Sequence, residues 1–292
     1  MLVRRLSTLL VFMQSAIVVT GASVRLTGSG LGCSTWPECT PGSYTPTPNQ
    51  PETQLHAWIE FGNRLLTFVL FLNAVTLFLT ILIFNLRKLT KLAGLQILGI
   101  LAQAIIGGIT VLTGLNPISV ASHFLLSIVV IAGALSLRQR AYGATPSEVV
   151  TSLLSRRLGR ALLALTLLVI VMGTVVTGSG PHAGDEAATR FSLDAKTMAW
   201  IHADLVIALV GLTLALVIAI KLGETERTRL FWGRKVRLFL IVILAQGGIG
   251  YVQYFTGLPE IIVAAHVCGA VLVWLSAWNI AITGNLLRSD RQ

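Results

Sequence analysis

The sequence AQAIIGGITVLTGLNPISVASHFLLS, residues 102–127, returns in related form as AQGGIGYVQYFTGLPEIIVAAHVCGA at residues 245–270. Each copy opens with Ala-Gln and has the pattern of an apolar helix, a short Gly-containing turn, and a second apolar helix with one His near its start. The offset is the same for both polar residues: 266 − 123 = 143 for the histidines and 246 − 103 = 143 for the glutamines. Because a shared offset over this length indicates an internal repeat, we interpret the chain as two copies of one unit.

The composition indicates a membrane protein. Of the 292 residues, 54% are hydrophobic and 12% are charged, whereas soluble domains carry about 25% charged residues; the mean hydropathy is +0.79. A helix needs about 20 apolar residues to cross the bilayer. The sequence contains eight such runs, at roughly residues 6–24, 61–84, 92–112, 118–137, 158–176, 198–220, 238–255 and 261–282. We therefore predict an all-α membrane protein with eight transmembrane helices, arranged as two pseudo-symmetric four-helix bundles in domains 1–140 and 141–292.

The first apolar run follows Arg4 and Arg5, so it also has features of a signal peptide. It is longer than the apolar core of a signal peptide, which has about 7–15 residues. Its removal would leave the first copy one helix short of the second. We expect it to be a transmembrane helix.

The net charge of +10 does not indicate nucleic-acid binding. Of the 22 Lys and Arg residues, 18 lie on one side of the expected membrane, and the other side carries only Arg25, Arg64, Arg190 and Lys196. The positive-inside rule then predicts that both termini are cytoplasmic. Membrane topology alone accounts for the basic residues.

The first outer loop, from Arg25 to about Gln54, contains Cys33 and Cys39 in the sequence GLGCSTWPEC. Because this loop is expected outside the cytoplasm and holds an even number of cysteines, we expect a disulfide. Two unpaired thiols are the alternative. Cys268 has no nearby partner in the sequence, and we expect it to be a small buried residue of the last helix.

The second expected helix opens with polar residues, in the sequence LHAWIEFGNRLL. His56, Glu60 and Asn63 are spaced so that they share one helical face. An ionisable residue within a membrane span is a candidate functional residue, although Glu60 also lies near enough to the surface to be an interfacial carboxylate. Alignment of the two AWI tripeptides, residues 57–59 and 199–201, puts His202 at the position of Glu60.

Four histidines lie at the outer ends of alternate helices: His56, His123, His202 and His266. The last three are expected about 6–8 Å from the start of their helices. Pairs of inward-facing side chains build cofactor sites in helical bundles, and two imidazoles on opposite faces satisfy haem iron. Zinc fits less well, because it needs three or four clustered ligands. We therefore predict two haem sites, one in each half, near the outer side.

The chain resembles the heme A synthase family over essentially its whole length. The resemblance is carried by TGSGLGC (residues 27–33), EFGNR (residues 60–64), the surroundings of His123 and His266, and the eight spans in two halves. It implies an oxidoreductase that oxidises the C8 methyl group of heme O to a formyl group by successive hydroxylations. The product is heme A for terminal oxidases.

The resemblance also implies a set of site residues. His202 and His266 correspond to the axial ligands of a heme b cofactor in the C-terminal half. In the N-terminal half, His123 corresponds to a ligand of the substrate heme O and Glu60 to the catalytic glutamate. The family's outer-loop cysteines correspond to Cys33 and Cys39.

Two further features concern the expected substrate half, the first from the residues themselves and the second from the resemblance. Arg25 and Arg64 lie at the outer surface, where we expect them to pair with haem propionates. Many family members have a His where this chain has Asn63, and Asn is a poor haem ligand. Either His56, on the same face, replaces that ligand, or the substrate iron has His123 as its only histidine ligand.

The resemblance places the protein in a bacterial plasma membrane, with heme O synthase as the upstream partner. The sequence leaves the membrane electron donor and the oligomeric state open, a homo-oligomer being one alternative. A di-haem electron carrier of the cytochrome b561 type would use the same histidines but has no need of Glu60. A secondary transporter fits less well, because the polar residues cluster at one surface and not at the midplane.

Overall fold

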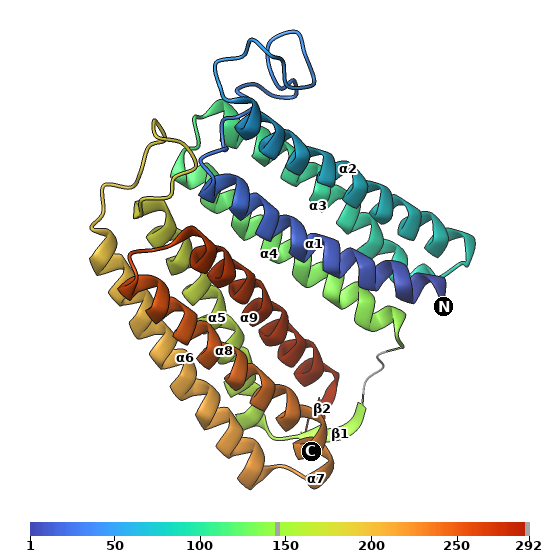
Figure 1. Ribbon diagram of the computed structural model, residues 1–292. Coiled ribbons are helices and arrows are strands. Elements are labelled where there is room, and N and C mark those ends of the chain that lie inside the picture. The colour runs from blue at the N-terminus through green and yellow to red at the C-terminus, as the bar shows by residue number, and fades with distance from the viewer. Residues whose placement is uncertain (144–146, 290–292) are drawn as a thin grey trace. The chain divides into compact units, whose positions relative to one another are not determined.

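The computed structural model describes residues 1–143 and 147–289 and consists mainly of long helices (Figure 1). Its elements are α1 (Leu2–Leu26), α2 (Gln54–Ile83), α3 (Arg87–Leu112), α4 (Pro117–Ala141), β1 (Ser147–Thr151), α5 (Leu153–Ser179), α6 (Ala195–Gly223), α7 (Glu226–Thr228), the π-helical turn η1 (Arg229–Gly233), α8 (Arg234–Phe255), α9 (Glu260–Leu286) and β2 (Leu287–Ser289). In the described part of the chain, eight helical segments are long and apolar enough to cross a membrane. The predicted fold class is confirmed, with one small addition: β1 and β2 pair as a short parallel ribbon.

The first four helices form a closed ring. Helix α1 packs against α2 and α4, and α3 packs against the same two helices. Short connections make α2, α3 and α4 alternate in direction, as in an up-and-down bundle. All four contribute to one apolar core, which includes Leu10, Leu77, Ile100 and Leu137.

The helices α5, α6, α8 and α9 share a second apolar core. It includes Leu162, Leu216, Phe239 and Ile280, one from each helix. Trp232, in η1, is fully buried against this core. Its indole Nε1 donates a hydrogen bond to the carbonyl oxygen of Ile280 at 3.1 Å, which fastens the segment before α8 to α9.

The described residues group into two compact units. Among the described residues, the first consists of residues 1–141 and 174–198, and the second of residues 142–143, 147–173 and 199–289. The last turns of α5 and the loop that follows it therefore belong with the first bundle.

Two tight turns share an uncommon backbone conformation. Gly114 and Leu115, between α3 and α4, have φ angles of 61° and 58°. Gly257 and Leu258, between α8 and α9, have φ angles of 78° and 63°. A positive φ is rare and costly for leucine, and both pairs are separated by the repeat offset, 257 − 114 = 143. The duplication inferred from the sequence is therefore also present in the backbone.

Candidate functional site

The helices that carry the histidines begin at well-defined caps. Pro117 is the first residue of α4, and the side chain of Asn116 accepts a hydrogen bond from the Ile118 amide at 2.9 Å; both features favour a helix start. Helix α6 follows Asp194, whose carboxylate accepts bonds from the hydroxyl and amide of Thr197 at 2.6 and 2.8 Å. These bonds lower the pKa of Asp194, so the cap is intact above that pKa and is lost as the pH falls through it.

His202 of α6 and His266 of α9 lie opposite each other in the second unit. Their ring centroids are 6.5 Å apart, and the ring planes meet at 69°. The Nδ1 atoms of both rings are buried and have no hydrogen-bond partner. Two metal–imidazole bonds of about 2 Å each, with the radius of each ring added, span a separation of this size. The geometry fits an iron held between the two rings.

Glycines of neighbouring helices lie against both rings. A Cβ atom on Gly250 of α8 would lie 3.2 Å from Cε1 of His266, and one on Gly173 of α5 would lie 3.3 Å from Cε1 of His202. Gln246 donates a hydrogen bond to the carbonyl oxygen of His266 at 2.8 Å. The glycines leave room for the imidazoles, and Gln246 ties α8 to the helix that carries His266.

The first unit repeats half of this arrangement around His123. Gln103 of α3 donates hydrogen bonds to the carbonyl oxygen of His123 at 3.2 Å and to the hydroxyl of Ser127 at 2.6 Å. A Cβ atom on Gly107 would lie 3.2 Å from the His123 ring. The buried Nδ1 of His123 also lacks a partner. Gln103, Gly107 and His123 thus match the second-unit residues 246, 250 and 266 at one offset.

His56 has no such pairing. It lies in the first turn of α2, where its amide donates to the side chain of the capping residue Thr53 at 3.3 Å. Within residues 1–143 and 147–289, no ring contact joins His56 to His123, and no group of three or more His, Cys, Asp or Glu side chains is close enough to hold a metal ion. Asn63 faces α1, because its side-chain oxygen accepts a hydrogen bond from Thr20 at 2.7 Å.

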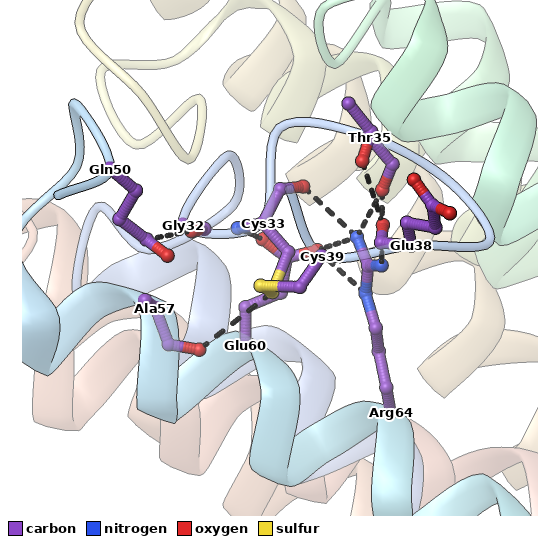
Figure 2. Close-up of polar contacts among 9 residues, drawn as sticks. All are labelled: Gly32, Cys33, Thr35, Glu38, Cys39, Gln50, Ala57, Glu60 and Arg64. Carbon is purple, nitrogen blue, oxygen red and sulfur yellow. Dashed lines mark hydrogen bonds and ion pairs between the residues drawn. A yellow bond between two sulfur atoms is a disulfide. The ribbon is translucent and has the colours of Figure 1, made fainter. Parts of the chain in front are cut away.

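Glu60 is buried and bonded to the first outer loop (Figure 2). One carboxylate oxygen accepts the amide of Cys33 at 2.6 Å, and the other forms an ion pair with Arg64, also at 2.6 Å. Cys33 and Cys39 are joined by a disulfide with an S–S distance of 2.08 Å, which confirms the predicted bond. Glu60 therefore connects α2 to the ring that this disulfide closes.

The guanidinium group of Arg64 holds the same loop. Besides Glu60, it donates to the carbonyl oxygens of Cys33 at 3.0 Å and of Thr35 and Glu38 at 3.1 Å. All three of its nitrogens are thus engaged by protein acceptors, and the expected contact between Arg64 and a propionate finds no support in this geometry.

Arg25 differs from Arg64, because its buried Nε has no partner. One terminal nitrogen donates to the carbonyl oxygen of Thr177 at 2.7 Å. A second cation, Arg190, is near enough to interact with it electrostatically. A partly buried, incompletely bonded guanidinium beside another positive charge is suited to bind a carboxylate.

The sequence alone did not indicate how the outer loop packs on the bundle. Trp36 lies on Gly108 of α3, where a Cβ atom would collide with the indole ring, and Gly32 lies against the backbone of His56 with no room for a side chain. Trp36 therefore packs on Gly108, the residue that follows Gly107. The expectation for Cys268 is wrong: its side chain is exposed, because it lies on the outward face of α9 and not on the face that carries His266.

Comparison with known proteins gives consistent similarities. A family model described as COX15-CtaA, cytochrome oxidase assembly protein, matches residues 4–278. The chain is 37% identical over 128 residues to the heme A synthase of Lysinibacillus sphaericus, covering 41% of this chain and 39% of that protein. It is 23% identical over 254 residues to the heme A synthase of Bacillus licheniformis, covering 81% of each chain. It is 32% identical over 151 residues to that of Bacillus pumilus, covering 50% of this chain and 47% of the relative.

Proposed function

The chain belongs to the COX15-CtaA family of cytochrome oxidase assembly proteins, and on this premise we propose that it is a heme A synthase. In this proposal it is an oxidoreductase that converts the C8 methyl group of heme O to a formyl group. Three bacterial relatives that bear the name heme A synthase support the proposal.

The observation that carries the proposal is the pair of facing imidazoles, His202 and His266, 6.5 Å apart. His202 and His266 together would hold haem b, which would supply electron transfer. The first unit has the same arrangement of Gln, Gly and His around His123. In the sequence alignment, Glu60 takes the position of His202. One site with two imidazoles and a second with an imidazole and an acid suit a cofactor and a substrate, respectively.

The residues of this chain have distinct roles in the proposal. When bound, the two haems supply the electron transfer and the oxygen chemistry. His123 binds the substrate iron on one face, and His56 is the candidate for the other face. Glu60, paired with Arg64, holds or moves a proton near the methyl group. Arg25 binds a propionate, because its Nε has no protein partner.

The expected location is a bacterial plasma membrane, with both termini cytoplasmic and the haem sites near the outer side. Fusion of a reporter that is active only outside the cytoplasm tests this orientation. We expect activity for a fusion in the loop of residues 27–53 and none for a fusion after α9. Heme O synthase is the proposed source of the substrate.

The function is tested by expressing the chain together with a heme O synthase in a bacterium that makes no heme A, and extracting the haems. We expect heme A in the extract and heme b bound to the purified protein. A protein that carries heme b alone, in cells that contain heme O, would contradict the proposal and favour the electron carrier of the cytochrome b561 type.

A further inference from the structure

The core of the first bundle contains three amide side chains away from the histidine site. Gln14, Asn73 and Gln96, on α1, α2 and α3, are 4%, 8% and 3% exposed. Gln14 lies one turn after the core residue Leu10, and Asn73 and Gln96 each lie between core residues of their own helices. All three therefore face the inside of the bundle.

The three amides lie within about one helical turn of one another along the bundle axis. A hydrogen bond between Thr8 and Arg138 joins α1 to α4 and sets a common level for the two helices. Gln14 lies six residues beyond Thr8 and Gly133 lies five residues beyond Arg138, in the same direction along the bundle. Gln14 and Gly133 therefore differ in level by about 2 Å. Gln96 lies against Gly133, where a Cβ atom would be 2.6 Å from Nε2 of Gln96.

The level of Asn73 follows from the bond between Thr20 and Asn63, which joins α1 to α2. Counted from that bond, Asn73 lies about 6 Å beyond Gln14, which is one helical turn. Three helices thus contribute an amide to one polar layer, which we define as Gln14, Asn73 and Gln96.

Four polar atoms of this layer are buried without a hydrogen-bond partner. They are Nε2 of Gln14, Nδ2 and Oδ1 of Asn73, and Oε1 of Gln96. A buried polar group that is left unpaired costs about 1–3 kcal/mol. Two of the atoms are donors and two are acceptors, and none is charged.

The second bundle provides an internal comparison, because it is a copy of the first. The repeat offset puts Phe239 at the position of Gln96, 96 + 143 = 239, and the buried residues of α5 and α6 near this level include Leu162 and Leu216. In the described part of the second unit, the unpartnered buried side-chain atoms belong instead to His202, Gln246, Gln253 and His266. The fold packs well without a polar layer, so the layer is a property of the first bundle alone.

We propose that the polar layer binds a small cluster of ordered water molecules inside the membrane-spanning core of the first bundle. Water both donates and accepts, and so satisfies a mixed set of neutral amide donors and acceptors. An ion has no opposing charge among these three residues, and an apolar ligand leaves the amides unpaired. The inference rests on the bundle alone and does not depend on the proposed function.

Labelling of side chains by hydroxyl radicals, generated from bound water by an X-ray pulse, tests the proposal on the purified full-length protein. Phe78 is the reporter, because it follows Asn73 by five residues on α2 and its partly buried ring packs against the apolar core that surrounds the polar layer. Phe239, fully buried at the matching level of the second bundle, and Phe68, 70% exposed on the outer face of α2, are the controls.

We expect Phe78 to be labelled several times faster than Phe68 and Phe239 in the unmodified protein. The double substitution Asn73→Leu with Gln96→Leu removes three of the four unpartnered atoms and is expected to slow labelling at Phe78 alone. Labelling of Phe78 as slow as that of both controls overturns the proposal, and this result needs no variant. Unchanged labelling of Phe78 in a folded double variant also overturns it.

Discussion

A glycine beside each imidazole is the feature on which the histidine sites depend at the scale of single residues. The Cβ positions of Gly107, Gly173 and Gly250 all lie 3.2–3.3 Å from a histidine Cε1. Any larger side chain there has to displace the ring. The histidines were predicted from the sequence, but the glycines were not, because glycine is common throughout membrane-spanning helices and its presence alone does not mark a site.

The substitution Gly250→Leu is expected to displace the His266 ring and lower the haem b content roughly tenfold, or about 1.4 kcal/mol of binding free energy. The ratio of haem to protein in the purified variant measures this. Gly248→Leu is the matched control on the same helix, because nothing lies within 4 Å of its Cβ position. Equal haem content in the two variants would show that the space left by Gly250 beside the His266 ring has no role in haem binding.

Arg64→Lys keeps the positive charge beside Glu60 but removes the planar fork that reaches three loop carbonyls. We expect the free energy of unfolding to fall by about 2 kcal/mol, a typical value for hydrogen bonds to a charged group. We also expect faster proteolysis within residues 27–53. Arg87→Lys is the control, because the Nε of Arg87 bonds to the adjacent turn residue Asn85 and not to the outer loop. Identical proteolysis of the two variants would contradict the role of Arg64 in holding the loop.

The chemistry of Glu60 was only partly foreseen from the sequence. Its position within a polar helical face marked it as a candidate functional residue. Its partners, the Cys33 amide and Arg64, depend on how a loop of more than twenty residues returns to α2. Periodicity carries no information about such a return, so the network was visible only in three dimensions.

At the scale of elements, the two Gly-Leu turns share one backbone shape but differ in packing. Leu115 is 7% exposed and packs with Ala183 and Ala188, whereas Leu258 is only partly buried. Leu258→Gly is expected to stabilise the protein, because it removes a left-handed leucine that costs about 1–2 kcal/mol. Leu115→Gly loses about 2 kcal/mol of burial as well, which offsets that gain. Thermal unfolding in detergent compares them, and equal shifts would refute the distinction.

The disulfide ring is the second element with a testable role. Cys33→Ser with Cys39→Ser opens a ring of seven residues, and the loop-entropy relation gives a loss of about 2 kcal/mol. The loss is expected to appear as a lower unfolding temperature. The exposed Cys268 provides the control: Cys268→Ser is expected to leave the unfolding temperature unchanged. A double variant as stable as this control would contradict a stabilising ring.

Element boundaries were predicted less well than the elements themselves. All eight spans were expected, and the second helix was expected to open at Leu55, one residue after α2 begins, although its apolar run starts only at residue 61. The first two turns of α2 are polar because they carry His56, Glu60 and the contacts of the outer loop. A hydropathy criterion discards such turns, although Thr53 caps the helix before them.

At the scale of the whole molecule, the duplication predicts that the two halves can be inactivated separately. His266→Ala is expected to remove haem b from the purified protein. His123→Ala is expected to keep haem b but to abolish the conversion of heme O to heme A. Haem content and extracted pigments are measured for both variants. Loss of haem b in the His123 variant with the second bundle still folded would contradict the assignment of one haem to each half.

The class of fold could be predicted because apolar runs mark the membrane spans. The internal repeat could be predicted because matching residues are separated by a constant offset. The polar layer of the first bundle could not, since Gln14, Asn73 and Gln96 lie on three helices with unrelated spacings. Only their burial, within about one helical turn of one another, distinguishes them from isolated polar residues.

The left-handed leucine of each turn also bears on ancestry. A backbone shape that is costly for leucine is seldom reached twice by independent routes. This conformation recurs at positions that are separated by the repeat offset, although most of the flanking residues differ between the two copies. We infer that both turns derive from a single ancestral segment. The acid at position 60 and the imidazole at position 202 then record a divergence that followed the doubling.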